Sequence, residues 1–265
     1  MCSNYRPVTR LDRLLTYFGV ERGRDEESQD VFPLGMAPFI RLSVEGQEGG
    51  RPALVAEDGM FGLLPYFATE LQYGRRCYNA RSETVARLPS FRDAWSRGQR
   101  CIIPAEAFYE PCYESGRAVR WRIWQDGDVP MGIAGVYTEW RNPQGQRQFT
   151  FAMLTVNADG HPLMSRMHAP GEEKRMVVIL DRADYLDWLS CDVKDAARYL
   201  RQWPGPLLGE PAAVVPVPKA AQPKSEAPGA ALPQPPQPPK PQKPAKPRPP
   251  TPPAEGEPPI QGDLF

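Results

Sequence analysis

The sequence predicts an α+β fold that is rich in β-structure and is followed by a long tail. Strand-like segments succeed one another along most of the chain, and few segments show the spacing of a long helix. Prolines are unevenly distributed, because 21 of the 33 lie from Pro204 onward. We therefore expect one domain over residues 1–218, large enough to bury a core, and a disordered tail over residues 219–265.

The N-terminal third predicts one helix and several strands. Four apolar residues recur at helical spacing over residues 11–18, with Thr9 as the candidate N-cap and Gly19 as the stop. The polar, charged stretch over residues 20–30 indicates a surface loop. Strand-like composition then appears at three places, which are residues 39–44, 52–56 and 60–66.

The rest of the domain alternates short helices with strands. Ser82 is placed to cap one short helix, and a second is expected to begin at Ser90. Residues 101–110 predict a strand, a break at Pro104 and a second strand, and the period-two pattern of residues 119–124 predicts a half-exposed strand. The remaining expected elements are strands over residues 131–140, 148–156, 176–180 and 213–217 and closing helices over residues 185–189 and 196–200.

Composition excludes several classes of protein. The formal net charge is zero, so nucleic-acid binding would depend on local patches. Five cysteines without paired spacing favour reduced thiols over a disulfide framework. Two histidines and no C-x-x-C motif give little support for a zinc site, and no apolar run reaches the ~18 residues of a membrane span. We expect a cytoplasmic protein without metal or cofactor.

The first residues carry the strongest chemical signal. Cysteine at position 2 is small enough for aminopeptidase removal of Met1, which would leave Cys2 with a free α-amine beside its thiol. Such a 1,2-aminothiol condenses with an aldehyde to an imine, and the thiol then closes a thiazolidine ring. The reference pKa of an α-amine is about 7.7–8.0, so part of the amine is nucleophilic near neutrality.

Three other segments carry candidate site residues, each with a structural alternative. Asn79 and Arg81 place an amide and a guanidinium close together, although the same stretch also fits the start of a helix. Glu110 follows an apolar run, where burial would favour acid–base chemistry, although such a residue is often a solvated strand end. His161 and His168 share one loop and alternatively lie free on the surface.

These segments together resemble the SRAP (SOS response-associated peptidase) family of abasic site processing proteins. The resemblance rests on Cys2, the block at residues 79–84, the block at residues 101–110, and the His168 loop leading into residues 175–180. It extends from Cys2 to about residue 218. It implies a β-rich core of mixed and antiparallel, barrel-like sheets with peripheral helices.

The resemblance also implies a function and roles for single residues. The family's N-terminal cysteine forms a thiazolidine crosslink with abasic sites in single-stranded DNA, which shields the lesion during replication and the SOS response. Asn79 would bind near the amine and the sugar, Glu110 would shuttle protons, and His168 would act in ring opening and crosslink reversal. Peptidase-like release of Met1 and lyase-type activity are implied as well. Phosphate contacts are expected from Arg81, Arg166, Lys174 and Arg175.

The sequence departs from the family pattern in three places. Ser3 and Asn4 stand where many members have glycine and arginine, and Pro111 stands where many have tryptophan. Residues 169–173 lengthen the loop after His168, which leaves His161 as the competing candidate for the catalytic histidine.

The tail ends in a short apolar motif. Its proline-rich composition predicts an extended linker that does not bury a core. The last five residues resemble the pentapeptide that binds the bacterial sliding clamp, with candidate contacts from Gln261, Asp263, Leu264 and Phe265. A motif on a flexible tether suits recruitment to a replication fork.

Two other functions fit the same residues. One is a cysteine-dependent peptidase that acts on other proteins, and the other is a non-catalytic, clamp-tethered adaptor for single-stranded DNA. A metal hydrolase has too few ligands. A monomer is the simplest expectation for a protein that acts on single lesions.

Overall fold

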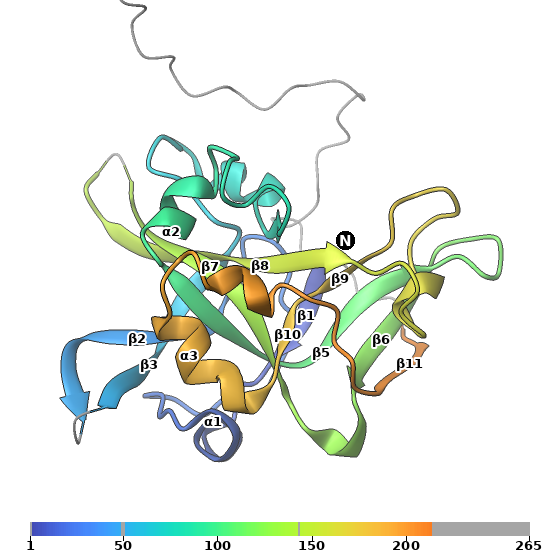
Figure 1. The fold of residues 1–265 in the computed structure, drawn as a ribbon, viewed down its shortest axis with the longest axis horizontal. Coiled ribbons are helices and arrows are strands. Elements are labelled where there is room, and N and C mark those ends of the chain that lie inside the picture. Colours follow the sequence, from blue (N-terminus) through green and yellow to red (C-terminus); the bar gives the residue numbers. More distant parts are fainter. Residues whose placement is uncertain (1, 49–50, 143, 214–265) are drawn as a thin grey trace, which may run out of the picture. The chain divides into compact units, whose positions relative to one another are not determined.

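The computed structural model describes residues 2–48, 51–142 and 144–213, which fold around a closed β-barrel (Figure 1). Each barrel strand pairs with the next, and the last pairs with the first. Only the pairing of β3 with β8 is parallel within this ring. The strands in order around the barrel are β2 (Met36–Glu48), β3 (Arg51–Phe61), β8 (Arg147–Asn157), β7 (Met131–Arg141) and β5 (Arg100–Cys112). The expected β-rich, barrel-like α+β class is confirmed.

Aromatic side chains fill part of the barrel core. Phe39, Phe61 and Phe151 are fully buried, and the ring of Phe151 lies 5.6 Å from that of Phe39 and 5.7 Å from that of Phe61, measured between centroids. Gly59 is required beside them, because a Cβ at this position would lie 2.8 Å from the Phe39 ring. Burial of such rings supplies much of the driving force for folding.

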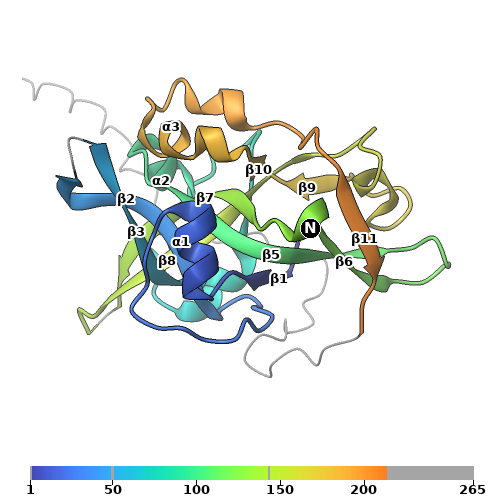
Figure 2. The same ribbon diagram turned by 90° about the horizontal axis from the view of Figure 1, so that it is seen from below.

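Six further strands of the described residues lie outside this ring, and each pairs with a barrel strand or with a neighbour of one. Figure 2 shows β1 lying along β5, whereas β6 pairs with the opposite edge of β5 and β11 pairs with β6. These strands are β1 (Asn4–Pro7), β4 (Asn79–Arg81), β6 (Val119–Gln125), β9 (Arg175–Val177), β10 (Ile179–Leu180) and β11 (Leu207–Pro211). Because β4 and β9 both pair with β8, two of the predicted site segments flank the same strand.

The helices are short and lie outside the barrel (Figure 1). The α-helices are α1 (Leu11–Phe18), α2 (Arg92–Ser96) and α3 (Tyr185–Ser190), and 3₁₀ helices cover Leu71–Arg76, Asp126–Asp128, Met164–Arg166, Arg182–Asp184 and Ala196–Tyr199. The predicted helix over residues 11–18 and its stop are confirmed, since Gly19 has the left-handed conformation with φ of 68°. The N-cap assignment was wrong. Arg10 occupies that position, and the Thr9 hydroxyl instead donates to the carbonyl of Glu26 at 2.7 Å.

Other sequence expectations are corrected by the structure. β5 runs unbroken through Pro104, so the predicted break is absent. Along one edge of β5 the partner changes from β2 to β1 near Pro104. The N–H that proline lacks is therefore not needed by either set of inter-strand hydrogen bonds. Ser82 begins a series of turns rather than a helix. The last described strand ends at Pro211, while residues 214–217 of the expected edge strand lie outside the described residues, as does the 261–265 motif. No helix in the described part of the chain is long and apolar enough to cross a membrane.

Candidate active site around Cys2

Cys2 lies two residues before the start of β1 and is held by contacts with β1 and β4. Asn4 pairs with Tyr109 of β5, and the Cys2 thiol donates to the Asn4 carbonyl with 3.3 Å between sulfur and oxygen. From β4, the side-chain amide of Asn79 donates to the Cys2 carbonyl at 2.8 Å. Cys2 is fully buried. The Asn79 side chain thus contacts residue 2 through its carbonyl, while the predicted contact near the amine and the sugar stays a prediction.

Glu110 and His168 form a pair beside Cys2. Oε2 of Glu110 lies 3.0 Å from Nε2 of His168, and the two side chains are 1 % and 5 % exposed. Glu110 lies near the end of β5, and its charge acts on the Cys2 thiol. A buried carboxylate against an imidazole is an arrangement that transfers protons, because each group can hold the proton that the other releases.

The loop that carries His168 is fixed to the end of β5. Met167 forms an isolated bridge with Cys112, and the His168 amide donates to the Pro111 carbonyl at 2.7 Å. The Lys174 ammonium donates to the carbonyls of His168 and Ala169, each at 3.0 Å. His168 has a φ of 64°, which is uncommon for a residue with a side chain. These bonds hold the imidazole against Glu110 at the expense of local strain.

The Cys2 thiol is held neutral. Burial raises its pKa, the charge of Glu110 raises it further, and together they bring it to about 12. Burial also raises the pKa of Tyr78, with Cys2 and Glu110 as further causes, and the pKa of Tyr5, with Cys2 and Cys101 as further causes. Both phenols are therefore hydrogen-bond donors near Cys2. Neither tyrosine stands out in the sequence, although Tyr78 directly precedes the candidate residue Asn79 and Tyr5 lies three residues after Cys2.

Several buried polar atoms of this region lack a hydrogen-bond partner among the described residues. They are Nδ2 of Asn4, the hydroxyl of Tyr5, Oδ1 of Asn79 and Nδ1 of His168. Buried polar groups are normally paired, so a group of them around one nucleophile indicates capacity for a polar ligand. The atoms available are two donors, one acceptor and a ring nitrogen that can serve as either.

The four residues predicted to contact phosphate are in different environments. Arg166 is exposed, makes two hydrogen bonds to Glu114 at 2.7 and 2.8 Å, and lies over the Trp121 ring. Lys174 is occupied with the backbone of the His168 loop. Arg81 is 46 % exposed and pairs with Glu173. Arg175 is 2 % exposed, so it reaches a phosphate only if the residues around it move.

His161, the competing histidine, has a structural role. Its Nδ1 accepts hydrogen bonds from the amides of Leu163 and Met164, at 3.2 and 3.1 Å. Burial lowers the pKa of His161, and the backbone of Trp203 opposes this more weakly. His161 is thus a neutral acceptor that shapes the loop, whereas the His168 ring lies against the Glu110 carboxylate.

The burial of His161 predicts a pH dependence of stability. Because its pKa is lower folded than unfolded, its contribution is complete above the unfolded value of about 6.5 and is lost as the pH falls through the folded pKa. We expect His161→Ala to cost about 1–2 kcal/mol at neutral pH through the two lost acceptor bonds. Denaturant unfolding at neutral and mildly acidic pH measures both effects.

The matched control for this prediction is His161→Asn. Its amide oxygen can still accept from the backbone but does not titrate, so this variant should lose less stability than the wild type as the pH falls. Equal acid losses in the wild type and His161→Asn would contradict the prediction.

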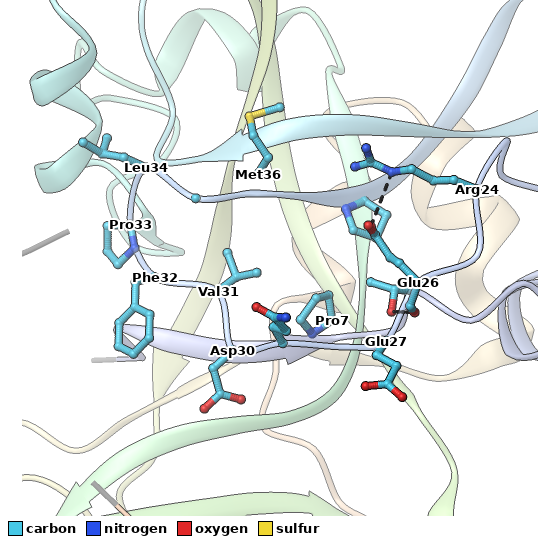
Figure 3. A pocket seen from close by; sticks show the side chains of 14 residues that line it. Pro7, Arg24, Glu26, Glu27, Asp30, Val31, Phe32, Pro33, Leu34 and Met36 are labelled. Carbon is cyan, nitrogen blue, oxygen red and sulfur yellow. Dashed lines mark hydrogen bonds and ion pairs between the residues drawn. The ribbon is translucent and has the colours of Figure 1, made fainter. Parts of the chain in front are cut away.

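A cavity of about 520 Å³ lies away from these residues, between β1 and the segment 24–38 (Figure 3). Its lining includes no cysteine or histidine. Figure 3 shows the Arg24 guanidinium paired with Glu26, and the Asp30 carboxylate at the same cavity. Asp30 forms ion pairs with Arg6 of β1 and Arg120 of β6, and it accepts a hydrogen bond from the Tyr109 hydroxyl of β5. It therefore links these three strands. Among the described residues, no group of three or more His, Cys, Asp or Glu could hold a metal ion.

Sequence comparisons show which known proteins this chain is similar to. Residues 1–222 match the family model described as SOS response associated peptidase (SRAP). Abasic site processing protein YoqW of Bacillus subtilis (strain 168) is 33% identical over 195 residues, which cover 72% of this chain and 80% of that protein. Abasic site processing protein HMCES of Gallus gallus is 24% identical over 214 residues, which cover 69% of this chain and 60% of that protein.

Solved structures show the same fold. A protein from Bordetella bronchiseptica is 35% identical with a TM-score of 0.71, and the match covers 80% of this chain and 100% of that one. A protein from Bacteroides thetaiotaomicron, 20% identical, has a TM-score of 0.67 over 80% of this chain and 92% of its own. At that identity the second likeness supports the fold alone.

Proposed function

The chain belongs to the SOS response associated peptidase (SRAP) family, and from this premise we propose that it detects abasic sites in single-stranded DNA and crosslinks to them through Cys2. Curated relatives named abasic site processing proteins support abasic-site DNA as the substrate. The observation that carries the proposal is the grouping of Cys2, Asn79 and the Glu110–His168 pair at one place.

The first chemical step uses the amine of Cys2. In the encoded sequence this nitrogen is in a peptide bond to Met1, so removal of Met1 must come first. The freed amine then adds to the C1′ aldehyde of the ring-opened abasic sugar, and loss of one water gives an imine. Glu110 and His168 would supply the proton that the departing hydroxyl needs. Asn79 would keep residue 2 oriented through its carbonyl.

The second step uses the thiol. With a pKa of about 12, the Cys2 thiol is protonated at neutral pH and needs a base as it attacks the imine carbon. The Glu110 carboxylate, which already acts on this sulfur, would take the proton, and the imine nitrogen gains one as the five-membered thiazolidine closes. Reversal would follow the same route, with His168 returning a proton to the ring.

The same pair suits release of Met1. Hydrolysis of the Met1–Cys2 peptide bond needs a base for water and an acid for the leaving amine, and the Glu110–His168 pair, whose carboxylate acts on the Cys2 thiol, could supply both. We propose this as the peptidase-like activity of the protein.

A second proposal concerns the C-terminal motif. Residues 261–265 are proposed to dock on the bacterial sliding clamp, and this rests on the sequence motif alone.

The proposal is tested with processed, full-length protein and three single-stranded oligonucleotides. One carries an abasic site, one a tetrahydrofuran analogue that has no aldehyde, and one is undamaged. We expect a heat- and SDS-stable shifted band with the abasic strand only. Intact mass should equal protein plus DNA minus one water, as the balanced steps require.

Two outcomes would oppose the proposal. No stable band with a verified N-terminal Cys2 would exclude crosslinking, and turnover of unrelated peptides under those conditions would favour the cysteine-peptidase alternative. Equal binding to all three strands without a covalent product would favour a non-catalytic adaptor.

A further inference from the structure

One carboxylate bridges two of the arginines that are expected to hold DNA. Oε2 of Glu173 lies 2.7 Å from Nη1 of Arg81, and Oε1 of Glu173 lies 2.5 Å from Nη1 of Arg175. Arg81 is in β4 and Arg175 begins β9, so the bridge joins strands on the two sides of β8. Glu173 itself is in the loop that follows His168.

The two arginines depend on Glu173 to different degrees. Arg175 keeps other partners, since its guanidinium also pairs with Glu83 at 3.0 Å and donates to the Thr155 carbonyl at 2.8 Å. Within the described part of the chain, the Arg81 side chain makes no other ion pair or hydrogen bond. If Glu173 moves away, Arg175 stays held and Arg81 presents a free positive charge to solvent.

Arg81 is well placed relative to the nucleophile. It lies two residues after Asn79 in β4, and side chains two apart on a strand share a face, about 7 Å from one another. Asn79 contacts the carbonyl of Cys2. A phosphate that flanks a sugar bound at Cys2 would therefore meet Arg81 on the same side of the strand.

A carboxylate and a phosphate present similar paired oxygens to a guanidinium. We infer that Glu173 is an internal substitute for DNA phosphate at Arg81, which it occupies in the free protein and leaves when the strand binds, while Arg175 keeps its contacts with Glu83 and Thr155. This inference rests on the proposed function, because it assigns a role to the anion site beside the crosslinking residue. Exposed ion pairs such as Glu173–Arg81 contribute little stability, so the exchange is accessible.

The exchange has a measurable signature. In the free wild-type protein Glu173 already neutralises Arg81. Breaking that pair therefore offsets part of the binding free energy that a phosphate contact contributes. Removing the carboxylate charge should tighten binding about 2- to 5-fold at low salt, the range expected for loss of one exposed ion pair. It should also make the dependence of log affinity on log salt steeper by about 0.7, the value of one extra phosphate contact on a single strand.

The test is anisotropy titration of full-length protein with the tetrahydrofuran strand, which binds without reacting, from about 50 to about 200 mM salt. Glu173→Gln is compared with Glu172→Gln, its matched control. Glu172 is the neighbouring exposed residue, and within the described residues its carboxylate contacts no cation. Both variants change the net charge equally, so we expect tighter binding and a steeper salt dependence only for Glu173→Gln.

Arg81→Gln completes a double-mutant cycle. If Glu173 acts by masking Arg81, the gain from Glu173→Gln should largely disappear in the Arg81→Gln background. Identical binding by the Glu173 and Glu172 variants, or weaker binding with a lowered melting temperature for Glu173→Gln, would overturn the inference. If the wild type crosslinks abasic DNA while the two variants match, only this inference fails; if it neither binds nor crosslinks, the proposed function fails too.

Discussion

Cys2→Ala is expected to abolish the heat-stable crosslink while leaving a weaker, reducible one. Alanine is also small, so Met1 should still be removed and the α-amine should still form an imine with the abasic aldehyde. Without Sγ the ring cannot close. External thiol at millimolar concentration should not substitute, because well-oriented intramolecular groups reach effective concentrations of about 10⁵ M or more. Denaturing gels with and without borohydride measure both species.

The controls separate the amine from the thiol. Cys2→Ser keeps the amine and a hydroxyl and should behave like Cys2→Ala, since a hydroxyl is a poor nucleophile at neutral pH. Cys2→Leu should retain Met1, which keeps the amine of residue 2 in a peptide bond, and should give less borohydride-trapped product than Cys2→Ala, because only the Met1 amine and lysine amines remain to form an imine. A stable band from Cys2→Ala, equal in yield to that of the wild type, would show that another residue forms the bond.

Much of the site was predictable because its residues fall next to recognisable local patterns. Cys2 follows the initiating methionine, and Glu110 ends an apolar strand segment. Their mutual geometry was not predictable from those patterns. The 3.0 Å approach of Glu110 to His168 depends on bonds from the His168 loop to Pro111 and Cys112, which are far away in sequence.

The choice between the two histidines shows the same limit. Both are in one loop and both are buried, so composition and exposure do not distinguish them. What separates them is the partner of each ring, which is backbone N–H for His161 and a carboxylate for His168. The partner of each ring depends on the loop conformation, including the left-handed backbone of His168. Hydrophobic periodicity in the sequence does not predict that conformation.

Arg175 illustrates how tertiary contacts override a residue's usual preference. An arginine after a lysine in a polar loop is typical of a surface position, where a phosphate contact is expected. The chain instead buries it, because Glu83, Glu173 and Thr155 converge on its guanidinium from three other segments. Burial raises the pKa of Glu83, but the hydrogen bonds from Arg175 and further contacts outweigh this and lower it overall.

The position of Glu110 beside a buried thiol gives it two opposite effects on Cys2. Its negative charge, added to burial, raises the pKa of the thiol and so reduces the thiolate available to any outside reagent. The same carboxylate is the base that the thiol needs when the imine is in place. Replacing it should therefore make Cys2 more reactive in general and less effective in its own reaction.

Glu110→Gln is expected to slow crosslinking by about 10²- to 10⁴-fold, the usual contribution of a positioned acid–base group. Binding of the tetrahydrofuran strand should be nearly unchanged. Alkylation of Cys2 should become faster, because the thiol pKa falls once the charge is removed. Peptide mapping after timed alkylation measures this, with Cys101 as internal control, since burial alone raises the pKa of that thiol.

His168→Asn tests whether the two residues act as a unit. Groups that share one proton path are strongly non-additive, so the double variant should be about as slow as the slower single variant. Independent roles would instead multiply the two losses. If Glu110→Gln slowed crosslinking and Cys2 alkylation alike, a general loss of access or of folding would explain it, and Glu110 would not be the base. If Glu110 is the base, Glu110→Gln must slow crosslinking through the Cys2 sulfur and at the same time speed alkylation of that sulfur.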